Sequence, residues 1–81
     1  MFFGISIRIY YDDHSPPHFH AYYGSNAAVI QIATLQVLFG ALPRRALALV
    51  LEWAQVHREE LNTDWTLARM HMPLKAIEPL E

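Results

Sequence analysis

The stretch that decides the fold is residues 18–33, which read HFHAYYGSNAAVIQIA. Apolar and polar side chains alternate on either side of Gly24-Ser25, a pattern typical of two half-buried strands joined by a two-residue turn. One register places the inward-facing apolar residues of the two strands opposite one another, whereas a slip of one residue would place inward-facing apolar residues opposite histidines. The predicted pairs are Tyr23 with Asn26, Ala21 with Ala28, Phe19 with Ile30, His20 with Val29, and His18 with Gln31.

Two further strands are predicted beside this hairpin. Residues 3–11 also alternate, with Phe3, Ile5, Ile7, Ile9 and Tyr11 on the inward side. Asp12 to Pro17 end that strand, because adjacent prolines remove two donors from a sheet ladder. Thr34–Phe39 is a short fourth strand that points Leu35, Val37 and Phe39 inward and ends at Gly40.

From Pro43 the period becomes helical and predicts one long helix to Leu61, with proline in the first turn. Asn62-Thr63-Asp64 indicates a break or a new N-cap before a short helix from Trp65 to Met72. Pro73 to Glu81 is an extended tail, with Leu74, Ile77 and Leu80 available for docking onto the helices. The predicted fold class is α+β: an antiparallel meander of three to four strands, with two helices packed on one face of the sheet, in a single domain spanning residues 1–81.

The composition narrows the classes of function. Of 81 residues, 53% are apolar and 17% charged, and there is no cysteine for a disulfide or a thiolate metal site. The net charge of -2 gives no strong signal for DNA binding. No apolar run approaches the ~18 residues that a membrane span needs, and no signal peptide is evident, so we expect a cytoplasmic protein with no membrane partner.

The long helix carries more apolar surface than one sheet needs. Its second apolar stripe, which a folded-back tail or a second chain would cover, consists of Leu42, Ala46, Leu49, Trp53 and Val56. Two arginines at the start of a helix oppose its dipole and are consistent with an acidic partner chain or a nucleic-acid phosphate; the alternative is that both are simply solvated. The predicted partner-binding residues are therefore Arg44, Arg45, Leu49, Trp53 and Val56, for a small cognate protein or a homo-oligomer.

Histidines mark a second candidate site. His18 and His20 are two residues apart on a strand, so both rings leave the same face. Asp12 and His14, or the neighbouring Asp13, would reach over from the loop as further metal ligands. Nitrogen and oxygen ligands in this mixture suit Zn, Fe, Ni or Cu. The alternative is an ordinary polar strand face beside a loop with good turn chemistry.

The same sheet face has a wider candidate role. It gathers cations, hydroxyls and imidazoles, which would hold a phosphate or an RNA backbone, or cleave RNA by acid–base chemistry. The alternative is a partner-facing surface, because tyrosine and arginine are also enriched at protein interfaces. The candidate residues of this face are Arg8, Tyr10, His14, His18, His20 and Tyr22.

Four segments together resemble a known family. They are YDDHSPPHFHA at residues 11–21, LPRR at 42–45, EWA at 52–54 and HREEL at 57–61. The chain resembles domain-of-unknown-function family 4160, a family of small bacterial proteins. The resemblance carries the family motif onto His14, His18 and His20 but implies no established activity. Family genes often lie beside those of another small domain, which suggests a toxin–antitoxin-like pair.

Two functions therefore remain open from the sequence. The first is a protein–protein interaction module of a two-gene, toxin–antitoxin-like pair, which the apolar surplus and the resemblance favour. The alternative is a small metal-dependent or RNA-cleaving enzyme that uses the cluster of His14, His18 and His20.

Overall fold

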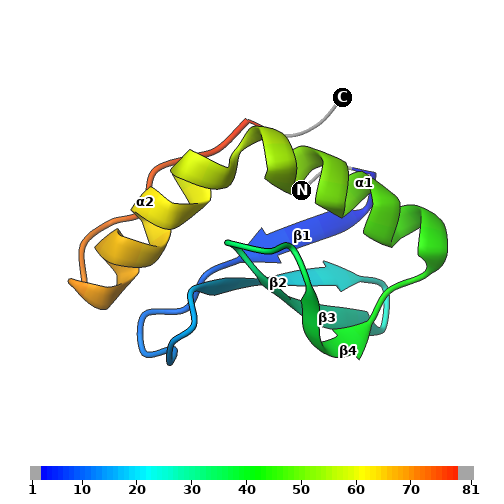
Figure 1. Cartoon of the computed structure of the whole chain (residues 1–81), viewed down its shortest axis with the longest axis horizontal. Helices are drawn as coiled ribbons and strands as arrows, with labels where there is room; N and C mark the ends of the chain where they lie inside the picture. The colour runs from blue at the N-terminus through cyan, green and yellow to red at the C-terminus, as the bar shows by residue number, and fades with distance from the viewer. Residues whose placement is uncertain (1–2, 79–81) are drawn as a thin grey trace.

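An antiparallel sheet of four strands lies under two helices (Figure 1). The computed structural model describes residues 3–78. The strands lie side by side in chain order, which confirms the predicted α+β meander with helices on one face. The elements are β1 (Ile5–Arg8), β2 (His18–Tyr23), β3 (Asn26–Gln31), β4 (Val37–Ala41), α1 (Arg44–Val56) and α2 (Arg58–Arg69).

The β2–β3 hairpin has the predicted register at every pair. Gly24 has φ +58, the left-handed conformation that a tight hairpin turn requires. Phe19, Ala21 and Ile30 are fully buried on the face beneath the helices, while His20 and Val29 lie on the opposite face. The period of two along the chain therefore fixes which side chains enter the core.

The core lies between the sheet and α1. Ala46, Val50, Trp53 and Ala54 are the buried residues of α1, and Trp53 meets Phe19 edge to face at 6.2 Å. Leu61 and Trp65 of α2 extend the same core. Neither helix of the described chain is long and apolar enough to cross a bilayer.

The first strand is shorter than predicted. β1 covers Ile5–Arg8, so the ends of the expected strand over 3–11 are wrong. Phe3 has φ +48, which bends the chain before the ladder begins, and Phe3 and Tyr11 are exposed. Ile5 is buried and Ile7 and Ile9 are half-buried, so the inward parity holds for these three residues.

The fourth strand starts later than predicted and is exposed throughout. Residues 32–34 form a turn, and Leu35 takes a left-handed φ of 60, so the strand runs from Val37 to Ala41 and not from Thr34 to Phe39. A bulge between Val29 and Ile30 shifts the pairing, so that Phe39 faces away from the helices and is 77% exposed. Leu35 packs half-buried against the core as expected, whereas Val37 and Phe39 are exposed, so the expectation that these two point into the core is wrong.

The helical segment breaks earlier than predicted. The break is at His57, whose φ of -107 and ψ of 23 leave the helical region, and not at residues 62–64. The His57 ring pairs with Glu60, and Arg58 donates from Nε to the carbonyl of Ile32 at 3.1 Å, which ties the start of α2 to the sheet. Asp64 is thus an interior residue of α2 and not an N-cap.

The tail folds back over the helices. Trp53 donates from Nε1 to the carbonyl of Glu78 at 2.7 Å, and the Lys75 amide donates to Asp64 Oδ1 at 2.9 Å. Ile77 packs against the core. Part of the apolar surplus on α1 is therefore covered by residues of the same chain; Leu80, expected to join them, lies outside the described residues.

Candidate functional site

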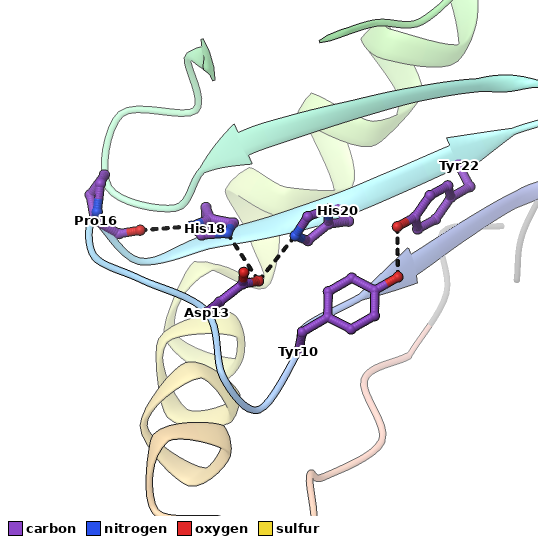
Figure 2. Close-up of polar contacts among 6 residues, drawn as sticks. All are labelled: Tyr10, Asp13, Pro16, His18, His20 and Tyr22. Atoms are coloured by element: carbon purple, nitrogen blue, oxygen red, sulfur yellow. Dashed lines mark hydrogen bonds and ion pairs between the residues drawn. The ribbon is translucent and has the colours of Figure 1, made fainter. Parts of the chain in front are cut away.

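The loop from Ile9 to Pro17 brings a carboxylate to the start of β2 (Figure 2). His18 and His20 are separated by one residue on this strand, so their rings leave the same side of the sheet. The loop turns over this edge and points Asp13 toward both rings. Local strand geometry and one loop therefore assemble three side chains that lie within eight residues of sequence.

These three residues form a compact set of metal-ligand atoms. Asp13 Oδ2 lies 3.1 Å from His18 Nε2 and 3.0 Å from His20 Nε2, and all three ligand atoms lie within 4.8 Å of one another. In a tetrahedral zinc site with bonds near 2.0–2.1 Å, ligand atoms are separated by roughly 3.3 Å. The site is therefore close to the size that one such ion requires.

A backbone contact fixes the orientation and tautomer of His18. Its Nδ1 lies 2.8 Å from the carbonyl oxygen of Pro16, which accepts only, so Nδ1 must carry the proton and donate it. In the neutral ring, Nε2 then presents a lone pair to Asp13 Oδ2. Two lone pairs at 3.1 Å repel each other unless a proton or a cation lies between them. A backbone carbonyl is also one of the common outer partners of the far nitrogen of a metal-binding histidine.

Aromatic side chains enclose the cluster on two sides. His18 packs against Trp65 of α2 with ring centroids 5.0 Å apart, and His20 lies edge-on to Tyr10 at 4.7 Å. Side-chain exposure is 11% for His18, 21% for His20 and 24% for Asp13, so the site is largely desolvated but open on one side. Low local polarity strengthens the attraction between a carboxylate and a bound cation.

A tyrosine pair borders the open side. The hydroxyls of Tyr10 and Tyr22 are 2.6 Å apart, and the Tyr22 ring stacks on His20 (Figure 2). The pKa of Tyr22 lies above its ordinary value, chiefly because of this hydrogen bond and secondarily because of burial. The Tyr22 phenol is therefore neutral at physiological pH and adds no charge to this face.

Two of the predicted metal ligands lie elsewhere. His14 is exposed and is not in the cluster, and Asp12 Oδ1 lies 3.6 Å from His71 Nε2. The structure thus brings together His18 and His20 with Asp13, where the sequence favoured Asp12 and His14. A polar pocket of about 250 Å³ beside the cluster is lined by Tyr11, Asp12, Asp13, His14, Arg69 and His71.

The predicted partner-binding residues do not form one surface. Trp53 is buried beneath the tail, whereas Val56 is 71% exposed. Arg45 and Leu49 line a shallow pocket of about 190 Å³ that continues onto the start of β1 and the end of β2. Arg44 is exposed at the start of α1. Of the five, therefore, only Arg45 and Leu49 lie side by side in an apolar depression.

A family model, described as Domain of unknown function (DUF4160), matches residues 4–66. The chain belongs to this family. Nothing among the curated proteins or the solved structures matches it. The matched segment includes the whole Asp13–His18–His20 cluster and Trp65, but not the tail that covers Trp53.

Two features of the site could not be predicted from the sequence. The Pro16 carbonyl and Trp65 both hold His18, and neither could be assigned from spacing, because a backbone contact and a tertiary ring contact leave no periodic signal. The choice of Asp13 over Asp12 depends on how the loop turns. The two histidines themselves were recognisable, since their spacing on a strand forces a common face.

Proposed function

We propose that the protein binds a divalent transition metal through Asp13, His18 and His20. One observation carries the proposal: both Nε2 atoms lie within 3.1 Å of the same carboxylate oxygen. Two imidazoles and one carboxylate are the ligand set of open zinc sites and of non-haem iron sites. Such a set leaves coordination positions for water or a ligand oxygen.

The contacts around the cluster hold the three ligands in place for an ion. The Pro16 carbonyl holds His18 with its Nε2 lone pair directed at Asp13 Oδ2, the arrangement that a cation between them would stabilise. Trp65 and Tyr10 limit how far the two rings turn away. A site whose ligands are already oriented loses little side-chain entropy when the ion binds.

Titration with Zn²⁺, followed by isothermal calorimetry and elemental analysis after dialysis, tests the proposal. We expect one zinc per chain, lost in Asp13→Asn, His18→Ala and His20→Ala. His14→Ala and Asp12→Asn are matched controls, because they remove the same chemical groups from the same loop outside the cluster. Retention of zinc by His18→Ala or His20→Ala, or equal loss in the controls, would contradict the proposal. Parallel titrations with Fe²⁺, Ni²⁺ and Cu²⁺ would identify the preferred metal.

A second candidate function is binding of another protein, as in a toxin–antitoxin-like pair. The observation that favours it is the shallow pocket lined by Phe3, Tyr23, Arg45 and Leu49, which joins apolar side chains to a cation. An acidic segment with one apolar anchor would fit it. Co-expression with the product of a flanking gene tests this function: Leu49→Glu should abolish co-purification and Val56→Glu should not. Co-purification that survives Leu49→Glu would exclude this pocket.

A further inference from the structure

One face of the sheet is not covered by α1, and α2 reaches it only at the start of β2, where Trp65 contacts His18 (Figure 1). The strand register places Arg8 beside His20, His20 beside Val29, and Val29 beside Phe39. Directly paired residues of neighbouring strands point to the same face. A continuous row of side chains therefore crosses all four strands on the open face and includes one of the proposed metal ligands.

The open face presents aromatic rings to solvent. Phe39 is 77% exposed at one end of the row, and Tyr10 is 42% exposed near the other. Tyr22 lies next to His20 on the same side and is half-buried. Exposed planar rings on a sheet are the surfaces on which unpaired nucleic-acid bases stack. Burial in the core does not account for Phe39, since most of its surface is exposed to solvent.

The strands carry little charge. The four strands contain one charged residue, Arg8, and no aspartate or glutamate. Carboxylates occur in the helices, in the Asp12-Asp13 loop and in the tail. Among the described residues, Arg8 has no carboxylate within salt-bridge distance. Arg8 therefore offers a phosphate one cation on the open face, while the Asp13 carboxylate lies against His20 on the same face.

We propose that the open face binds a short single-stranded nucleic acid, with bases stacked on Phe39 and Tyr10 and a backbone phosphate held between Arg8 and the metal. The inference rests on the proposed metal centre, whose ion would offset the charge of Asp13 and offer a position to a phosphate oxygen. Single-stranded RNA and DNA share this chemistry, so both are used as probes. A duplex is not expected, because stacking on a sheet needs unpaired bases.

Fluorescence anisotropy of fluorescein-labelled decauridylate and decathymidylate, with zinc-loaded protein, tests the inference. Phe39→Ala should weaken binding about tenfold, the usual effect of losing one stacked base. Arg8→Gln should reduce the slope of log affinity against log salt by about 0.7, the value for one phosphate contact on a single strand. Val56→Ala and Arg44→Gln, which remove an exposed apolar side chain and an exposed cation from α1, should change neither quantity. Tighter binding of decauridylate than decathymidylate would assign the face to RNA.

The outcomes separate this inference from the metal proposal. Zinc content is measured by dialysis in the same samples, so loss of zinc binding contradicts the proposed function independently of the oligonucleotides. The inference is overturned, and the metal proposal is not, if zinc-loaded protein binds neither oligonucleotide. The same holds if Phe39→Ala and Arg8→Gln bind both oligonucleotides as tightly as the native chain does. Sedimentation velocity supplies the competing outcome: a dimer that Phe39→Ala dissociates, without oligonucleotide binding, would assign this face to a second copy of the chain. Circular dichroism confirms that each variant is folded.

Discussion

Replacing Asp64 with asparagine should flatten part of the pH dependence of stability. Asp64 is only 4% exposed within α2, and its Oδ1 accepts the Lys75 amide at 2.9 Å. Burial raises the pKa of this carboxyl above its ordinary value, and the Glu60 carboxylate adds to the rise, while the Lys75 contacts oppose it. The folded protein therefore holds the proton more tightly than the unfolded chain does.

The sign of the effect follows from linkage. The stabilisation from protonated Asp64 is complete below the ordinary aspartate pKa and is lost as the pH rises through the raised value. Asparagine keeps an acceptor for the Lys75 amide and cannot ionise, so Asp64→Asn should not show this loss. The difference in free energy of unfolding, variant minus native chain, should therefore rise from about pH 3.5, just below the ordinary aspartate pKa of ~4, toward neutral pH.

Asp64→Ala separates the hydrogen bond from the charge. It removes the acceptor of the tail amide, which is worth about 1–2 kcal/mol. In a domain of this size, that loss lowers the midpoint of thermal unfolding by about 4–15 °C. Thermal and urea unfolding followed by circular dichroism, from pH 3.5 to 8, measures both effects, with the exposed Asp12→Asn as the control. A parallel pH profile for Asp64→Asn and the native chain would refute the reasoning.

Two further predictions concern the sheet edge and the tail. Gly40→Ala should lower the free energy of unfolding by at least about 2 kcal/mol, because Gly40 has φ +78 and an added Cβ would fall on the carbonyl oxygen of Ala27. Gly24 has φ +58 but open space around it, so Gly24→Ala should lower the free energy of unfolding by less in the same urea titration. Equal losses in the two variants would contradict the close approach of β3 and β4. Trp53→Phe removes the donor to the Glu78 carbonyl and should lower stability by about 1 kcal/mol. Hydrogen exchange at the Lys75 amide should then accelerate in Trp53→Phe, and unchanged exchange would show that this bond does not hold the tail.

The sheet was predictable where periodicity is strict. The β2–β3 hairpin follows from alternation on both sides of Gly24-Ser25, because burial of one face leaves a single consistent register. β4 was not predictable in the same way. Its position depends on the left-handed Leu35 and on a bulge in the ladder, which are tertiary adjustments rather than features of the residue pattern.

The boundary between the two helices could not be predicted from the residue types alone. Residues 62–64 resemble an N-cap, yet Asp64 serves as a buried acceptor for the tail, and that role depends on residues eleven positions later. The real break at His57 is fixed by Arg58 reaching back to Ile32. For the site, spacing identified His18 and His20, while the choice of carboxylate and the role of the Pro16 carbonyl required the folded loop.

The anomalous difference map of a crystal grown with Zn²⁺ tests the metal centre most directly. Data collected on both sides of the zinc absorption edge locate the ion without reference to activity. We expect one peak about 2.0–2.2 Å from Asp13 Oδ2, His18 Nε2 and His20 Nε2. No peak at this position, or a peak on His14 or His71 with the cluster empty, would contradict the proposed metal centre.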